Sequence, residues 1–409
     1  MARVTIELSY KPKNEEPTIY RSYTGNKTIT VTRTTDPPGS AFTRYTHRDS
    51  RSRNQPFTLL EVKDNGSPIQ GIPPAGHGGM PNVTSVSGYY WTGNTEKALI
   101  VGVTASAGGT TYYARISSST GWIGQHQLSG EALETQLDNL NCLFNQAVTI
   151  DLTKGRYGAG RRYCCAYHIN DQGRVSVESK TVSCTSHNTS SLTYYKHDIK
   201  AGGVRVAAIK FYDGSGHNTG RKRISAPELQ FSIECPVIVY TFYCRGNGPA
   251  LIYVENNGSS PVNKWFRKGT DGNTWEKVLD EVPDPESITD HNNYNELVNA
   301  IRSAGCRSYQ PCPLPKPEPP PEVAKESSPS GQAGHQGDTS DLGPAGKPDG
   351  TPQATKGSPG SPSFWENPTN TIPTVLTGVG VVSGLVGFAG FKGYKLYQSF
   401  NGDPWVRQI

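Results

Sequence analysis

An internal repeat in residues 1–306 constrains the fold more than any other feature of this sequence. Short blocks of the first half recur in the same order in the second half, about 150 residues later. We therefore expect two tandem modules, residues 1–147 and residues 148–306. The paired blocks are residues 4–8 with 148–152, residues 27–31 with 180–184, Tyr45 and His47 with Tyr195 and His197, residues 88–101 with 241–254, and residues 112–122 with 264–275.

Each copy consists largely of short β-branched and aromatic runs that are separated by Gly, Asn, Asp or Ser. Such runs are typical of strands joined by turns. Each copy then ends in a helical pattern, over residues 131–147 and 286–304, with apolar residues three or four positions apart. Ser129 and Ser287 are the expected N-caps. The predicted fold class is mainly β, or α+β, with one C-terminal helix closing each module.

Tryptophan and histidine recur at matching positions in the two copies. Trp122 and Trp275 lie before the predicted helices, and rings of this size are expected to fill the space between a helix and a sheet. His47 and His197 each lie in polar sequence rich in Tyr, Arg, Lys and Asp, and one shared histidine without an evident partner is a weak catalytic signal. We therefore expect a structural or surface role for both histidines rather than a catalytic one.

The composition changes at residue 307. Residues 307–371 are rich in Pro, Gly and Ser, and they cannot bury enough apolar surface to offset the entropy of ordering. We expect a disordered stalk there. Residues 372–391 carry no charged side chain and match the roughly 20 residues that a helix needs to cross a bilayer. They predict one transmembrane helix, followed by a short tail over residues 392–409.

Two motifs in this C-terminal region leave alternatives open. Gly380 and Gly384 form a GxxxG pair through which two transmembrane helices could dimerise, although a glycine-rich segment also yields this spacing by chance. The Pro-rich residues 311–321 favour an extended polyproline II stalk. The same residues could instead dock in an SH3-like groove.

The signals for membrane orientation disagree. The N-terminal residues, MARVTIELSY, lack the apolar stretch of a signal peptide, which favours a tail anchor and a cytosolic chain. Lys392 and Lys395, directly after the span, favour instead a cytosolic tail and an extracellular or lumenal N-terminal region. We expect the second orientation. It requires a non-standard export route or a gene model that misses its first exon.

The eight cysteines are even in number, which favours disulfides and an oxidising compartment over buried free thiols. None shows the C-x-x-C spacing of a zinc site, so no metal or cofactor is expected. Cys244 aligns with Trp91, and Cys306 follows the second helix where the first copy has no cysteine. This joint absence favours a bond between Cys244 and Cys306. Cys184 and Cys235 have no counterpart either, so other pairings stay open.

The sequence carries none of the common catalytic or nucleotide-binding motifs. Its net charge of +5 is below that expected of a dedicated nucleic-acid-binding protein. We expect neither an enzyme nor a nucleic-acid partner. Basic loop residues are candidates for binding anionic glycans, with ordinary solvated charge as the alternative, and the glycine-rich residues 154–162 are expected to form a hairpin loop. The candidates are Arg156, Arg161, Arg162, Arg221, Lys222 and Arg223.

Several segments carry a resemblance to a known family. They are GPALIYVE at residues 248–255, the pair Trp265 and Trp275, NYNELVNAI at residues 293–301, the Gly/Pro/Ser linker, and GDPWVRQI at residues 402–409. In these the chain resembles the lineage-expanded membrane-protein families of Theileria-like piroplasm parasites. Some members carry the label complement component 3 CUB domain-containing protein. The resemblance implies a role at the surface of the parasite or of the infected cell.

Taken together, these features predict a single-pass membrane protein that displays two β-rich modules and has no catalytic activity. Its expected partner is a host protein or an anionic glycan. The alternative is a cytosol-facing, tail-anchored scaffold that recruits partners through its Pro-rich linker. The redox state of the cysteines separates the two hypotheses, since disulfides persist only in oxidising compartments.

Overall fold

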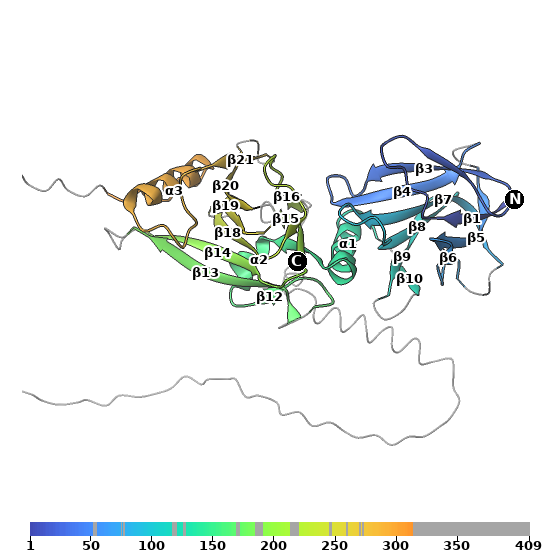
Figure 1. Ribbon diagram of the computed structural model, residues 1–409, viewed down its shortest axis with the longest axis horizontal. Helices are drawn as coiled ribbons and strands as arrows, with labels where there is room; N and C mark the ends of the chain where they lie inside the picture. The colour runs from blue at the N-terminus through green and yellow to red at the C-terminus, as the bar shows by residue number, and fades with distance from the viewer. Residues whose placement is uncertain are drawn as a thin grey trace, which may run out of the picture. The chain divides into compact units, whose positions relative to one another are not determined.

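The protein is mainly β, as the sequence predicts, with 47% strand and 12% helix (Figure 1). The computed structural model describes residues 1–313. The predicted transmembrane helix with Gly380 and Gly384, the tail and most of the predicted stalk lie outside the described residues. None of the described helices combines the length and apolar character needed to span a membrane. The gaps within the described range are residues 52–54, 75, 77, 117–120, 126–127, 169–171, 185–190, 213–220, 245–247, 259–260, 270 and 272–273.

The first half of the described chain forms one ten-stranded sheet. Its main path is antiparallel, and a second group of strands joins it because β5 pairs with β7. In that group β1 and β5 are parallel. The main path is β10 (Trp122–Gln125), β9 (Thr110–Arg115), β8 (Ile100–Ala105), β7 (Met80–Trp91), β4 (Phe42–Asp49), β3 (Thr28–Thr35) and β2 (Thr18–Arg21), and the second group is β1 (Arg3–Glu7), β5 (Phe57–Asp64) and β6 (Ser67–Pro68).

The second half forms a seven-stranded antiparallel sheet and a separate four-stranded sheet. In the smaller sheet β11 and β15 are parallel, as β1 and β5 are in the first half. The larger sheet is β21 (Trp275–Val278), β20 (Val262–Lys268), β19 (Pro249–Asn256), β18 (Val237–Tyr243), β14 (Ser191–Ile199), β13 (Val175–Ser183) and β12 (Arg162–Tyr163), and the smaller is β11 (Ala147–Asp151), β15 (Arg205–Phe211), β16 (Lys222–Arg223) and β17 (Ile233–Glu234).

The two halves share their strand order and an irregularity in the parallel pairs. When strands are matched by their place in the chain, the path from β10 to β2 has the same order as the path from β21 to β12. The β1–β5 register shifts between Val4 and Thr5, and the β11–β15 register shifts between Val148 and Thr149. A bulge of this kind bends a strand and increases its twist. Two unrelated β-rich modules would not be expected to have this irregularity at matching residues, so its recurrence supports a repeated module.

The strand β13 corresponds to β3 in a register that differs from the sequence comparison. His47 lies opposite Val31, and His197 lies opposite Val177. Val31 therefore corresponds to Val177, whereas the sequence blocks pair it with Cys184, and that block match is wrong. Both strands contain several Val and Thr residues, so a match shifted by seven positions looks as good in sequence as the true one.

The three described helices follow the predicted pattern in part. The first predicted helix begins after Ser129, as expected, but the Ser129 side chain makes no capping hydrogen bond and the helix ends at Phe144 rather than at residue 147. The last helix begins at His291 rather than at residue 286, because the Asp290 side chain accepts a hydrogen bond from the backbone N–H of Asn293 at 2.9 Å. Ser287, the expected cap, lies instead in a turn that ends before the helix. The helices are α1 (Gly130–Phe144), α2 (Thr153–Gly158) and α3 (His291–Ser303).

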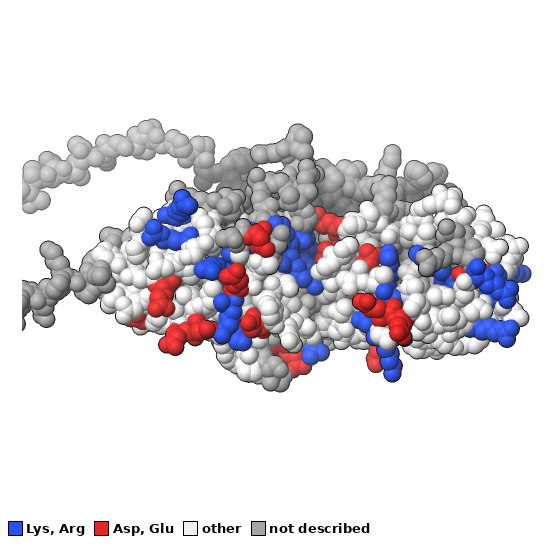
Figure 2. Space-filling view, turned by 90° about the horizontal axis from the view of Figure 1, so that it is seen from above, with Lys and Arg blue, Asp and Glu red and all other residues white. Residues whose placement is uncertain are grey.

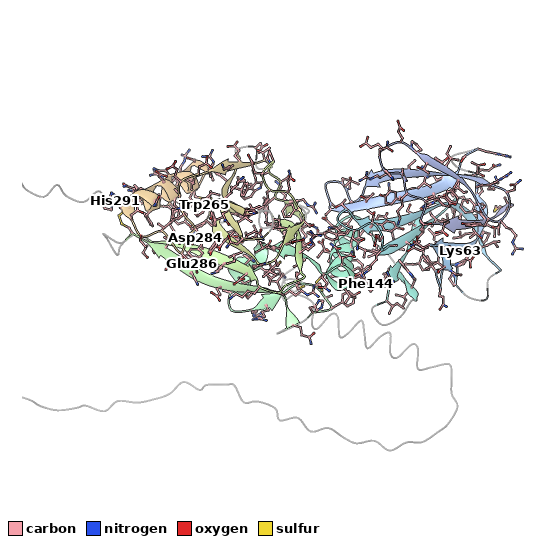
Figure 3. All side chains as sticks on the ribbon, in the orientation of Figure 1. Lys63, Phe144, Trp265, Asp284, Glu286 and His291 are labelled. Carbon is pink, nitrogen blue, oxygen red and sulfur yellow. A yellow bond between two sulfur atoms is a disulfide. The ribbon has the colours of Figure 1, made fainter. Side chains whose placement is uncertain are left out.

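Apolar side chains cover both faces of each large sheet. In the first half one cluster lies against β1 and β5, and another packs under α1. In the second half the matching clusters lie against β11 and β15 and under α3. Trp122 and Trp275 pack in the clusters at the parallel strands, so their predicted place beside the helices is wrong. Trp265 takes the place under α3, where its Nε1 donates to the carbonyl of Val282 at 2.9 Å (Figure 3).

We expect Leu137→Ala to lower the free energy of unfolding by about 2–5 kcal/mol. Leu137 is fully buried between α1 and the first sheet, so its truncation removes transfer free energy and leaves a cavity. Thr135→Ala, at an exposed position of the same helix, is the matched control. Urea unfolding measures both, and equal losses in the two variants would contradict the proposed packing.

Candidate metal centre

Three cysteines and one histidine converge where α1 meets the segment after β12. Cys142 lies in the last turn of α1, and Cys164 and Cys165 follow β12 directly. His168 ends a short turn in which its backbone N–H donates to the carbonyl of Cys165 at 3.3 Å. One sulfur or ring nitrogen from each of the four residues lies within 4.8 Å of all the others. This is the only such group among the residues that the structure describes.

The distances within this group, which we call the thiol cluster (Cys142, Cys164, Cys165 and His168), are short. The Sγ atoms of Cys142 and Cys164 are 2.6 Å apart. Nδ1 of His168 lies 3.1 Å from Sγ of Cys165 and 3.5 Å from Sγ of Cys142. Cys142 is buried, and the other three side chains are partly exposed. The cluster is therefore close to the surface on one side and closed by protein on the other.

Proximity changes the acidity of the thiols. Contact with the thiols of Cys142 and Cys164, together with the hydrogen bond to His168, lowers the pKa of Cys165. Contact with Cys164 and Cys165 raises the pKa of Cys142. A thiolate is the form of cysteine that binds metals and attacks disulfides.

Contacts around the cluster hold it in place. Arg174 donates from Nη1 to the carbonyl of Cys142 at 3.2 Å, and its Nη2 lies 3.4 Å from Nε2 of His168. The backbone N–H of Ala166 donates to Oδ1 of Asn139 on α1 at 3.0 Å. The loop after β12 is thereby fixed to α1 by contacts on both sides of the thiols.

The donor set has two chemical uses. Three thiolates and an imidazole match the soft ligands of a structural zinc site. Alternatively, Cys142 and Cys164 are near enough to form a disulfide after a small movement. The sequence predicts no metal site because Cys142 is far from the other three residues along the chain. The C-C-x-x-H spacing of residues 164–168 is the one local signal that pointed here.

The predicted anion-binding residues lie on different elements and differ in exposure. Arg161 and Arg162 are exposed, while Lys222 and Arg223 lie in β16 and are half-buried. Burial lowers the pKa of the Arg223 guanidinium. Arg156 lies in α2, where a hairpin loop is predicted, and its side chain is outside the described residues. On the face shown in Figure 2, basic and acidic side chains alternate instead of forming a single basic patch.

Arg221 does not fit the anion-binding prediction. Its guanidinium is largely buried and lies 3.3 Å from a carboxylate oxygen of Asp138 and 3.5 Å from one of Asp151. Two carboxylates therefore already occupy the positions that an anionic ligand would take. The sequence could not show this, because Asp138 belongs to α1 and reaches Arg221 only through the fold.

The same carboxylate belongs to a buried ion cluster. Nζ of Lys210, on β15, lies 2.5 Å from Glu134 and 2.7 Å from Asp138. The Lys210 side chain is 1% exposed, so its charge depends on these two partners. Asp138 also accepts a hydrogen bond from the hydroxyl of Thr149 on β11 at 2.8 Å. The acidic side of α1 is thereby fixed to the four-stranded sheet.

His47 and His197 are fully buried, each beside a tyrosine hydroxyl. Nδ1 of His47 lies 3.3 Å from Tyr20 Oη, and Nδ1 of His197 lies 3.0 Å from Tyr163 Oη. The hydroxyl of Tyr20 also accepts a hydrogen bond from the backbone N–H of Glu7 on β1, and the hydroxyl of Tyr163 accepts one from the backbone N–H of Asp151 on β11. Burial lowers the pKa of both histidines to about 3. These closed, neutral pairs are suited to a structural role.

Two disulfides hold the last part of the described chain. Cys244 at the end of β18 is bonded to Cys306 after α3, which is the pairing that the sequence favours. Cys184 after β13 is bonded to Cys312. Cys312 is 3% exposed and lies within the predicted stalk. The folded region therefore extends past the expected boundary at residue 306.

Comparison with protein-family models, with curated proteins and with solved structures finds no match for this chain.

We expect the free energy of unfolding to decrease as the pH is lowered, because the two buried histidines take up protons only when the chain unfolds. Their pKa is about 3 in the folded state and about 6.5 in an unfolded chain, so the unfolded state binds more protons between these values. The stabilisation is complete above pH 6.5 and is lost as the pH falls toward 3. At pH 5 the free energy of unfolding is therefore lower than at neutral pH by roughly 2 kcal/mol for each histidine.

Urea unfolding at pH 7.5 and pH 5 of His47→Gln and His197→Gln tests this expectation. Each variant should show about 2 kcal/mol less pH-dependent loss than the wild type. His291→Gln, at the start of α3, is the control and should keep the full dependence. An unchanged dependence in both buried-site variants would show that these histidines ionise freely in the folded state.

We expect Lys210→Met to destabilise the protein by about 3–5 kcal/mol, because it leaves Glu134 without its buried cation and Asp138 with Arg221 alone. The matched control is Lys200→Met, which removes an 83% exposed lysine paired with Asp198 and should cost less than about 1 kcal/mol. Chemical unfolding of both variants provides the comparison. A Lys210 variant as stable as the control would mean that the cluster is solvated.

Proposed function

We propose that this protein is a single-pass membrane protein that displays two tandem copies of one β-rich module and acts by binding rather than by catalysis. Its place would be the surface of a parasite or of an infected cell, in line with the family resemblance in its sequence. Its partner would be a host protein or an anionic glycan. Residues 372–391 would supply the anchor, and Gly380 with Gly384 a contact for helix pairing.

The repeated module is supported by detail at three levels. The strand order is the same in both halves, and each parallel pair carries its register shift at a matching residue. Each half also buries one tyrosine–histidine pair, Tyr20 with His47 and Tyr163 with His197. A chain that duplicates a packed module in this way presents two related surfaces to its partners.

The observation that carries the surface location is the pair of disulfides. The bonds from Cys184 to Cys312 and from Cys244 to Cys306 join strand ends to the segment that leads into the stalk. Such bonds form and persist in oxidising compartments. They also suit a module at the end of a stalk, because they resist unfolding at the point where the stalk joins it.

The binding role is favoured by the chemistry of the buried polar groups. Lys210 and Arg221 are bound to carboxylates, and His47 and His197 are bound to tyrosine hydroxyls. Groups held in this way support the fold and do not face a substrate. Of the candidate anion-binding residues, Arg161 and Arg162 are exposed, and in this proposal they would meet the glycan.

One observation favours the alternative, a cytosol-facing scaffold on a tail anchor. Cys142, Cys164 and Cys165 carry no disulfide, although they lie beside one another. Neighbouring thiols that stay reduced are typical of the cytosol. In that case the Pro-rich residues 311–321 would recruit the partners.

Protease protection on intact cells separates the two orientations. The native gene is expressed with an epitope tag at each end, and the cells are treated with protease before and after permeabilisation. We expect loss of the N-terminal tag and survival of the C-terminal tag on intact cells. An N-terminal tag that is cleaved only after permeabilisation would overturn the surface proposal and favour the scaffold.

A further inference from the structure

We propose that the thiol cluster, formed by Cys142, Cys164, Cys165 and His168, is a structural zinc site. The inference goes beyond the proposed function and does not depend on it, because it concerns what holds the two halves of the chain together. Zinc prefers four tetrahedral ligands of sulfur or nitrogen, and three thiolates with one imidazole form a known class of structural site.

The distances suit a single ion. Zinc–sulfur bonds of about 2.3 Å and zinc–nitrogen bonds of about 2.0 Å place neighbouring ligand atoms about 3.5–3.8 Å apart in a tetrahedron. Here His168 Nδ1 lies 3.1 and 3.5 Å from two of the sulfurs, and all four donor atoms lie within 4.8 Å of one another. The Sγ atoms of Cys142 and Cys164, at 2.6 Å, need to separate by about 1 Å to admit the ion.

The charge around the cluster also fits. Binding of Zn²⁺ releases three thiol protons to solvent, and the resulting complex of one dication and three thiolates carries a net charge of −1. The Arg174 guanidinium lies beside His168 and offsets this charge. With Nδ1 as the ligand, Nε2 of His168 keeps its hydrogen and cannot accept one from Arg174, so Nη2 of Arg174 has to move away from the ring while Nη1 stays bonded to the Cys142 carbonyl.

All four ligands come from protein, which leaves no open position for substrate or water. Closed sites of this kind are structural, whereas catalytic zinc keeps one position open. Cys142 is on α1, which packs under the first sheet, and the other three ligands follow β12 of the second. The ion would therefore cross-link the helix that ends the first module to a loop of the second.

A disulfide explains the cluster less completely. A bond between Cys142 and Cys164 uses two thiols, and it leaves Cys165 and His168 in contact with no role. A zinc ion uses all four side chains. Cys235 provides an internal comparison, since it is also unbonded and partly buried but has no place in the cluster.

Metal binding by the full-length chain tests the proposal. The chain is purified in detergent without oxygen, stripped with a chelator and titrated with Co²⁺, whose spectrum reports thiolate ligands and tetrahedral geometry. We expect one Co²⁺ per chain, displaced by one Zn²⁺. Cys165→Ser and His168→Gln should each weaken Co²⁺ binding more than about 100-fold, because losing a ligand lowers metal affinity more than losing a residue that only supports a ligand. Cys235→Ser should bind Co²⁺ like the wild type.

Thiol labelling of the wild-type chain needs no folded variant. Zn²⁺ should protect Cys142, Cys164 and Cys165 from alkylation and leave Cys235 as reactive as in the metal-free protein. X-ray absorption of the zinc-loaded chain should show three sulfur ligands and one nitrogen. A Cys142–Cys164 disulfide in metal-loaded protein, or Co²⁺ binding that survives both ligand variants, would overturn the site. Neither result bears on the protease-protection test, so the two proposals fail separately.

Discussion

A buried charge must be paired, and the pairing of Lys210 decides how α1 is placed. The lysine is 1% exposed on β15, and the carboxylates that neutralise it belong to Glu134 and Asp138. The opposite requirement comes from Leu133 and Leu137, which must be buried against the first sheet. One helix satisfies both conditions because its two faces differ. α1 is therefore part of the packing of both halves. Its apolar face covers the first sheet, and its acidic face neutralises a buried lysine of the second half.

The helical period extends this arrangement to the thiol cluster. Glu134, Asp138 and Cys142 follow one another at intervals of four, so they lie along one side of α1. The first two meet Lys210, and the third meets the loop after β12. Because the ion pairs fix the rotation of the helix, they also fix where the Cys142 thiol points. The thiol cluster thus depends on a charge interaction that contains no cysteine.

Local pattern predicted the elements of the fold better than their partners. The apolar spacing of Leu133 and Leu137 correctly predicted a helix, and the alternation of β-branched residues correctly predicted mostly strands. The register of β13 was wrong by seven residues: Val177 and Cys184 are both buried, and the sequence alone does not show which of them matches Val31. Trp275 was misplaced for a related reason: its size predicts burial but not which face of a sheet buries it.

The polar sites show a sharper limit of sequence. From the sequence, Arg221 is expected to be a solvated loop cation, but in the fold α1 and β11 place Asp138 and Asp151 beside it. Cys142 likewise gains its partners only when α1 meets the loop after β12. Cys244 was the favourable case, since the joint absence of Cys244 and Cys306 from the first copy favoured the bond that the structure has, although it left other pairings open. Because of the duplication, each copy serves as a reference for the other. A contact between the two copies, such as that of Arg221 with Asp138, occurs once and has no such reference.

The chain holds two kinds of cysteine that require opposite conditions. The bonds of Cys184 to Cys312 and of Cys244 to Cys306 need an oxidising compartment, where the adjacent thiols of Cys142 and Cys164 would also be expected to join. Bound zinc resolves the conflict, because thiolates that share an ion are withheld from exchange with an oxidant. The ion would then have to bind before oxidation. Since Cys142 is on α1 and its partners follow within the next few elements, the site can form while Cys306 and Cys312 are still unfolded.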